Sequence, residues 1–168
     1  MKKLLFFAVI AVLGLQNVNA QEASGQTEKG KWLIEANTGT AATGNTSFSL
    51  FSVDGNTAWS IGLDGGYFVM DDLAVKVGLG YGDNGAIDSF VYKVVAKYYI
   101  DSQFPVGIDF TGTSTDGNSA NWVGLQGGYA WFLGENVSIE PALRYNVTLD
   151  EQKALSAFQA QIGFVLHF

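Results

Sequence analysis

Apolar and polar residues alternate along most of this chain with a period of two, which predicts β-strands. The clearest example is the last run, Ser156 to Phe168, in which every second residue back from the terminus is apolar. This face consists of Phe158, Ala160, Ile162, Phe164, Leu166 and Phe168. The opposite face is mostly small or polar. We therefore expect the last strand to close a sheet, or to be covered by something outside the chain.

Seven similar runs precede it, and residues typical of turns separate them. We expect strands at residues 31–41, 57–69, 73–83, 89–100, 104–114, 121–133, 137–149 and 156–168. Each is long enough to cross a membrane as a tilted strand, and eight is an even number, as in single-chain bacterial barrels. Short connections at 70–72, 101–103 and 134–136 alternate with longer hydrophilic ones, the longest at 42–56. The prediction is an all-β, eight-stranded antiparallel up-and-down transmembrane barrel with short periplasmic turns.

The alternation alone leaves open which face is inside, because a soluble lipocalin-like barrel has its apolar face inward and a membrane barrel has it outward. Bulky residues such as Leu63 and Leu143 share one face, whereas glycines such as Gly62 and Gly124 share the other. An eight-stranded barrel has room inside for small side chains only. Charged residues make up just 15% of the chain, too few for a solvated outer surface. We expect the apolar face to contact lipid.

Aromatic residues recur near the expected strand ends. Tyr67, Tyr98 and Tyr129 follow one spacing, each just before a short turn, and with Trp32 and Trp131 they predict a belt at the periplasmic interface. The predicted outer belt consists of Trp59, Tyr81, Tyr92, Phe110 and Tyr145.

Eight charged residues of the expected strands lie on the polar face, four of each sign. The acidic ones are Glu35, Asp64, Asp109 and Glu140, and the basic ones are Lys76, Lys93, Lys97 and Arg144. Unpaired charges in a narrow lumen would be costly. We therefore predict a structural network of ion pairs that fills the lumen, with a catalytic or substrate-binding role of the carboxylates as the alternative.

The N-terminal part differs from the rest. Residues 1–20 have the charged start, apolar core and small-residue cleavage site of a secretory signal peptide, and residues 21–30 predict a flexible lead-in before a barrel at 31–168. Residues 1–20 contain two of the nine basic residues and none of the 16 acidic ones, so the remainder carries 7 basic residues and a net charge of −9. This charge argues against nucleic acid as a partner. The chain has no cysteine, which excludes disulfides and thiol chemistry.

The segment Gly66–Val75, with the sequence G-Y-F-V-M-D-D-L-A-V, resembles the G-Y-F-V-x-D-N-L-A-V hairpin of small bacterial outer-membrane β-barrel domain proteins, which are similar to the OmpX and OmpA barrels. The resemblance covers residues 31–168. It implies a monomeric integral protein of the bacterial outer membrane that contacts membrane lipid and lipopolysaccharide and has no cofactor. The implied role is structural or surface-interacting, in envelope integrity or in adhesion through the outer loops.

The last strand also resembles the terminal strand of such barrels, which ends in an aromatic residue and is read by the barrel assembly machinery. The resemblance implies that Phe164, Leu166 and Phe168 act as an assembly signal. The assembly machinery would then be a partner during biogenesis.

Motifs for catalysis are scarce. His167 is the only histidine and is expected to be structural, and the glycine-rich run at 78–82 lacks the strand–loop–helix context of a phosphate-binding loop. We predict that the protein is not an enzyme and binds no metal at a dedicated site. The alternatives are a lipid-modifying barrel enzyme and a secreted soluble barrel that binds a small apolar ligand.

The expected outer loops are acidic, with Lys153 as their basic residue. Their acids are Asp54, Asp83, Asp88, Asp116, Asp150 and Glu151. They are either solvated loop tips or carboxylates that bridge divalent cations to lipopolysaccharide phosphates, since carboxylate oxygens are ligands for Ca²⁺ and Mg²⁺.

Overall fold

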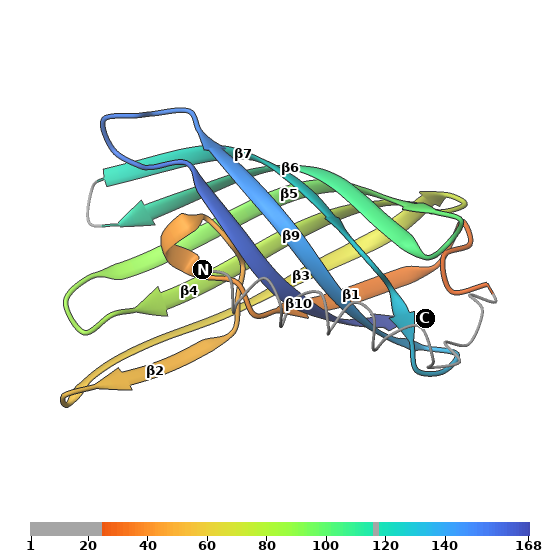
Figure 1. Cartoon of the computed structure of the whole chain (residues 1–168), viewed down its shortest axis with the longest axis horizontal. Coiled ribbons are helices and arrows are strands. Elements are labelled where there is room, and N and C mark those ends of the chain that lie inside the picture. Colours follow the sequence, from red (N-terminus) through yellow and green to blue (C-terminus); the bar gives the residue numbers. More distant parts are fainter. Residues whose placement is uncertain (1–24, 116–117) are drawn as a thin grey trace, which may run out of the picture.

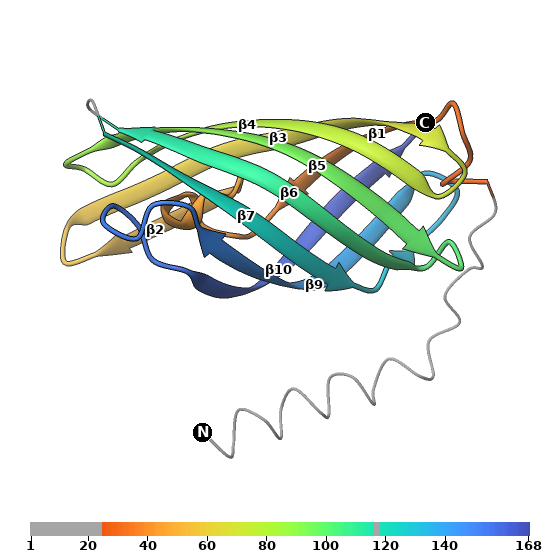
Figure 2. The same cartoon turned by 90° about the horizontal axis from the view of Figure 1, so that it is seen from above.

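The computed structural model describes residues 25–115 and 118–168, whose strands form one antiparallel barrel (Figures 1 and 2). The strands are β1 (Trp32–Asn37), β2 (Ser49–Val53), β3 (Asn56–Met70), β4 (Leu73–Asp83), β5 (Asp88–Ile100), β6 (Phe104–Thr115), β7 (Asn118–Gly128), β8 (Trp131–Phe132), β9 (Val137–Thr148) and β10 (Ala157–His167), with a short 3₁₀ helix, η2 (Ala41–Thr43). The sheet order is β1-β10-β9-β7-β6-β5-β4-β3-β2, and β1 also pairs with β3, which closes the barrel. The predicted signal peptide lies outside the described residues.

Two strand positions are each shared by two strands, β1 with β2 and β7 with β8, so the wall has eight positions. The predicted eight-stranded transmembrane barrel fold is thereby confirmed. Short turns join the strands at one end, which we call the turn end, and longer connections join them at the other, the loop end. Within the described residues, no helix is long and apolar enough to cross a membrane.

The expected strand at 121–133 is interrupted, because β7 ends at Gly128 and β8 begins at Trp131. The register against β9 does not change across this break, since Gly128 pairs with Ala142 and Trp131 pairs with Ile139. Tyr129 lies opposite Pro141 and donates a hydrogen bond of 3.1 Å to its carbonyl oxygen. Proline has no N–H to return a bond. The ladder is therefore incomplete at this one position.

The expected strand at 31–41 is wrong beyond Asn37, where β1 ends. Glu35 pairs with Asp64, and Ser49 pairs with Ser60. Between these two pairs, four positions separate Asp64 from Ser60 on β3, whereas fourteen separate Glu35 from Ser49 on the segment opposite. That segment therefore contains ten additional residues. We call these residues, 39–48, the insert. It folds into the barrel, and β2 then continues the wall where the sequence pattern predicted a loop.

The insert lies inside the barrel as far as Ser47, because small and polar residues suit it to the interior. Asn45, Thr46 and Ser47 are buried. Gly44 has φ of +68°, which favours glycine, and a Cβ atom there would lie 2.7 Å from the ring of Trp122. The insert therefore packs tightly against the opposite wall.

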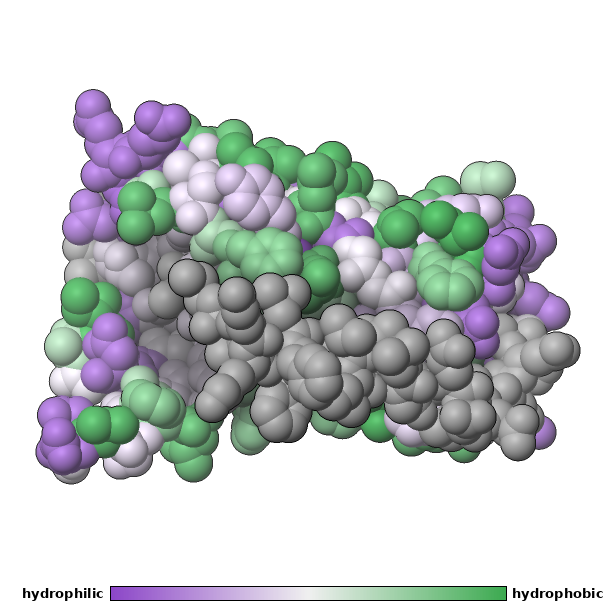
Figure 3. Space-filling view, in the orientation of Figure 1, coloured by the Kyte–Doolittle hydropathy of each residue, from purple (hydrophilic) through white to green (hydrophobic). Residues whose placement is uncertain are grey.

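The outward face is apolar, as the sequence predicts. Leu63, Val77 and Leu143 are exposed, and so are all six apolar residues of the last strand. Hydrophobic side chains gather along the middle of the molecule between two hydrophilic ends (Figure 3). Several residues of the two expected belts form ring pairs, including Trp32 with Tyr67 at 5.0 Å and Trp59 with Tyr81 at 5.9 Å between centroids.

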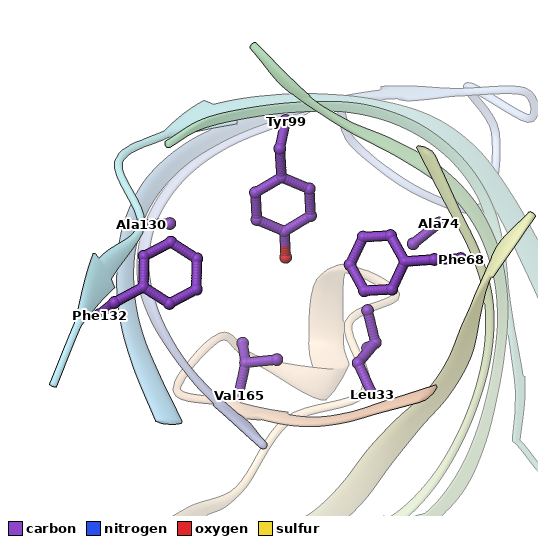
Figure 4. Packing of buried hydrophobic residues seen from close by; sticks show 7 residues of the cluster. All are labelled: Leu33, Phe68, Ala74, Tyr99, Ala130, Phe132 and Val165. Carbon is purple, nitrogen blue, oxygen red and sulfur yellow. The ribbon is translucent and has the colours of Figure 1, made fainter. Parts of the chain in front are cut away.

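The turn end of the interior is filled by apolar side chains, where the sequence pattern predicted small and polar ones. The buried cluster contains Leu33, Phe68, Ala74, Tyr99, Ala130, Phe132 and Val165 (Figure 4). The imidazole of His167 stacks on the ring of Phe68 and contacts that of Phe132. This end of the lumen is packed like the core of a soluble protein.

Residues 25–30, part of the expected flexible lead-in, are held against the turn end. Gln26 and Thr27 are buried. The hydroxyl of Thr27 donates to Asp72 at 2.6 Å, and the backbone N–H of Gly30 donates to the carbonyl of Phe68 at 2.9 Å. These bonds fix the segment to the first short turn, which differs from the flexibility that its polar sequence predicts.

The orientation of the faces predicts how arginine is tolerated. Replacing Leu143 by Arg at mid-strand should reduce the free energy of unfolding in a bilayer by about 2–4 kcal/mol, whereas Leu149→Arg in the loop after β9 should cost about 0–1 kcal/mol. The two leucines are matched, with 53% and 58% of their surface exposed. Denaturant titrations in lipid vesicles measure both. Equal effects would contradict a lipid-facing position of Leu143.

Candidate functional site

Six buried charged side chains cross the lumen as a chain of alternating sign. In order they are Lys93, Asp64, Lys76, Glu35, Lys97 and Glu140. The nitrogen–oxygen distances of the first four contacts lie between 2.6 Å and 3.1 Å, and Lys97 also pairs with Glu140. We call this set the charge chain. Its members come from β1, β3, β4, β5 and β9, so it connects opposite sides of the barrel.

The other two predicted charges form a separate ion pair nearer the loop end. Arg144 of β9 binds Asp109 of β6 with two parallel bonds, Nε to Oδ2 at 2.9 Å and Nη2 to Oδ1 at 2.5 Å. Thr111 donates to the same carboxylate at 2.8 Å. Gly124 of β7 lies between them, and a Cβ atom there would come within 2.5 Å of Asp109 Oδ2. A glycine is therefore required for this pair to cross β7.

All eight charged residues singled out in the sequence thus lie inside the barrel, each against a partner of opposite sign. Burial removes the hydration of each charge, which costs several kcal/mol per ion. Because the positive and negative groups alternate, this cost is offset within the lumen. The arrangement stabilises a closed interior and leaves its carboxylates occupied by lysine and arginine.

Polar groups at the turn end complete the network. Tyr99 donates to Glu140 Oε1 at 3.0 Å, and the Ser138 hydroxyl donates to the same oxygen at 2.9 Å. His167 Nε2 lies 3.0 Å from the Ser138 hydroxyl. In a catalytic triad the carboxylate orients the imidazole, whereas here Glu140 binds the serine. The arrangement therefore differs from that of a catalytic triad.

The insert caps the charge chain from the loop end. Thr46 donates to the carboxylate of Asp64, and Asn45 Oδ1 accepts from Lys93 at 3.1 Å. Asn45 Nδ2 donates to Gln161 of β10 at 2.6 Å. Sequence reasoning missed these residues, because the insert has no alternation that would place it. The Asp54–Gly55 pair that follows is a hairpin signal that could have located β2.

Two cavities of different size lie on either side of the insert. The cavity beside Glu35, Lys97 and Glu140 has a volume of about 10 Å³. Beyond the insert, a cavity of about 570 Å³ opens at the loop end, and we call it the vestibule. Its lining includes Ala41, Thr43, Thr113, Trp122, Lys153, Leu155 and Ala157.

The acidic residues of the loops are spread around the loop end. Asp83 and Asp88 are cross-strand partners, and Asp150 pairs with Lys153 at 3.3 Å. Asp116 lies outside the described residues. In the part of the chain that the structure describes, no group of three or more acidic or histidine side chains is placed to hold a metal. Cation bridging to lipopolysaccharide stays a hypothesis.

A closed antiparallel barrel with an apolar outer face and a charged interior defines the class of transmembrane β-barrels. The structure is similar to the N-terminal β-barrel domain of Pseudomonas aeruginosa OprF, with 17% identity and a TM-score of 0.55 over 83% of this chain and 98% of that one. It is also similar to the Yersinia pestis outer membrane protein Ail, determined in a phospholipid bilayer nanodisc, with 11% identity and a TM-score of 0.51 over 83% of this chain and 100% of that one.

No protein-family model and no curated protein matches the sequence. The likeness to these two structures therefore rests on the fold. The resemblance to outer-membrane barrels that the Gly66–Val75 segment indicates is confirmed at this level, and the chain has the fold of an eight-stranded outer-membrane barrel.

Removing one partner of the buried Asp109–Arg144 ion pair should cost much stability, and removing both partners should cost less. Asp109→Asn should reduce the free energy of unfolding by about 3–5 kcal/mol, since it leaves Arg144 without its counter-charge. Adding Arg144→Met should restore much of it. Unfolding in detergent measures both variants. Asp150→Asn is the control, because its pair with Lys153 is exposed and worth about 0–1 kcal/mol. Equal losses at the two aspartates would contradict the role of burial.

Proposed function

We propose that this protein is an integral outer-membrane barrel with a filled lumen, whose role is structural or surface-interacting and not enzymatic. The observation that carries the proposal is the charge chain, which joins opposite walls and leaves a cavity of only about 10 Å³ beside it. A cavity of that volume holds about one water molecule. A solute therefore has no path through the part of the lumen that the charge chain occupies.

Three successive layers support a filled lumen. The apolar cluster and residues 25–30 occupy the turn end, the charge chain occupies the middle, and the insert covers it from the loop end. The layers are bonded to one another, since Thr46 of the insert donates to Asp64 and Tyr99 of the apolar cluster donates to Glu140.

The outer surface supports a position in the outer membrane. The apolar band between the two belts would contact membrane lipid, with the turn end toward the periplasm and the loops toward lipopolysaccharide and the medium. A soluble barrel for an apolar ligand fits less well, because the apolar face points outward. We propose a monomer that acts through its outer loops, in envelope integrity or adhesion.

The terminal strand fits a role in assembly. Phe164, Leu166 and Phe168 point outward and are about half exposed. Phe168 also pairs with Trp32 through two backbone bonds of 2.7 Å and 3.0 Å, which complete the contact between the first and last strands. We propose that this edge is recognised by the barrel assembly machinery before the barrel closes.

A filled lumen predicts an absence of stable conductance. Purified protein in planar bilayers should give almost no regular single-channel steps. Glu35→Ala combined with Lys76→Ala should add at most rare, small steps, because the apolar cluster still fills the turn end while Lys93–Asp64 and Lys97–Glu140 remain paired. Large steps from the unaltered protein would contradict the proposal and indicate an aqueous pore.

Deletion of Phe168 should reduce assembly in cells far more than stability in detergent. The physical loss is one partly exposed ring, worth less than the roughly 1.5–3 kcal/mol of a fully buried one, together with the two backbone bonds to Trp32. Leu143→Ala is the matched control, since Leu143 is equally exposed at 53% but lies outside the terminal strand. Fractionation and heat-modifiable mobility on a gel measure the assembled fraction. Normal assembly of the truncated chain would contradict the signal, and a soluble periplasmic wild type would contradict the location.

A further inference from the structure

The wall of the barrel is incomplete toward the loop end. β1 pairs with β10 from Leu33–His167 to Asn37–Gly163. Beyond that point, residues 157–161 of β10 pair with β9 on one side, and on the other side no described strand pairs with them. β2 likewise pairs only with β3 among the described strands. We call the interruption between β2 and residues 157–161 the seam, and Figure 1 shows β2 diverging from β10 with the insert between them.

The insert is the cause of the seam. If β1 continued without interruption, Gly39 would pair with Ser60 of β3 and with Gln161 of β10. Ser49 takes this place opposite Ser60. Because ten is an even number, β2 keeps the inward and outward alternation of β1. The two free edges would therefore be in register if the insert were absent.

Apolar side chains gather along both edges of the seam. The four most exposed large hydrophobic side chains of the described residues, at 66–82%, all flank it, and Phe48 at 62% comes next. The four are Leu155, Leu50, Phe51 and Phe158. Along most of the apolar band each strand is paired on both sides, whereas β2 and residues 157–161 of β10 are paired on one side among the described strands.

The apolar surface also continues around the edge into the barrel. Phe48, the last residue of the insert, is exposed, and Leu50 of β2 is on the outward face, whereas Phe51 and Val53 of β2 are on the inward face. At other strands this level of the interior carries hydroxyl groups, as at Thr113 and Thr148. Neither residues 45–53 nor 154–161 contain a charge. The edges thus suit an uncharged, apolar chain.

The seam lies at the depth of the outer belt. Leu50 is the cross-strand partner of Trp59, and Phe158 that of Tyr145. In a bilayer this depth belongs to the outer leaflet. Lipid chains are therefore the apolar molecules present beside the seam.

The vestibule adjoins the β10 edge of the seam and the insert, since Ala157, Ala41 and Thr43 line it. Its volume of about 570 Å³ is within the range of roughly 300–1,000 Å³ of small-molecule sites. Leu155 and Ala157 line it on the β10 side, and Trp122 donates to the Leu155 carbonyl at 3.1 Å. Hydroxyl groups and Lys153, the one charged residue among the described residues that line it, can bind a polar head.

We propose that the seam is a lateral opening through which an acyl chain from the outer leaflet enters, with a single-chain amphiphile placing its head in the vestibule. The inference rests on the proposed membrane location. The chain lies between Leu50 and Phe158, and the vestibule hydroxyls and Lys153 bind the head. Free fatty acid and a chain of a bilayer lipid share this chemistry, and the experiment separates them.

The test uses tryptophan fluorescence, because the interior and the lipid face each carry a reporter. One variant keeps only Trp122, and a second keeps only Trp59, the other tryptophans being replaced by Phe. Each is reconstituted in vesicles with either a brominated fatty acid or brominated phospholipid, since bromine quenches nearby indole emission. Quenching of Trp59 by brominated phospholipid reports insertion in the bilayer, whatever happens at the seam.

We expect a saturable loss of Trp122 emission with brominated fatty acid. Its additional loss with brominated phospholipid would identify chains of bilayer lipids as occupants. An unaffected Trp122 beside a quenched Trp59 overturns the opening, whereas an unquenched Trp59 overturns the membrane location itself. An extended apolar peptide that protects the Phe158 and Ala160 amides from hydrogen exchange, without any effect of fatty acid on Trp122, would assign the seam to a protein strand instead.

Two variants test the route. Deleting residues 39–48 joins Thr38 to Ser49 in register and should close the seam, with loss of Trp122 quenching and retention of Trp59 quenching. Leu50→Glu with Phe158→Glu keeps the fold and should weaken fatty-acid binding, while Leu149→Glu in the outer loop should not. Unchanged quenching in the seam variants would show entry through the open loop end and overturn the lateral route.

Discussion

The closure of this barrel depends on how one lysine separates two carboxylates. Glu35 of β1 and Asp64 of β3 are direct cross-strand partners at the junction where the first strand meets the rest of the sheet. Like charges placed opposite one another destabilise a strand pair. Lys76 Nζ lies 2.6 Å from one carboxylate and 3.1 Å from the other, both fully enclosed. The junction is thereby converted from repulsive to attractive.

The same contact fixes the register of the neighbouring strands. A shift of one residue would turn every side chain of a strand to the other face. For β3, β4 or β5 such a shift would place Asp64, Lys76 or Lys93 against lipid and leave its partners buried without a counter-charge. The cost of an uncompensated buried charge, about 3–5 kcal/mol, is a large part of the net stability of a domain this size. The charge chain therefore selects one arrangement of the strands.

The sequence was sufficient for those features that depend on local alternation. A period of two places a charge inside or outside as soon as one face is known to be apolar, so Glu140 and Arg144 could be assigned to the lumen from their own strand. The break at Tyr129 could not be predicted, because it depends on Pro141, which faces it only after the register is known. Phe68, Tyr99 and Phe132 have inward parity, yet their meeting at the turn end depends on three different strands.

The insert shows where local reasoning stops. Its position is set by contacts such as Asn45 with Gln161, which are 116 residues apart, and its own sequence shows no period. The ten residues can cover the charge chain only by departing from the wall. As a consequence, the edges of β2 and β10 are not paired with each other. A straight first strand would seal the wall and leave the middle of the lumen uncovered from the loop end. Covering the charges and opening the wall are therefore two consequences of one insertion.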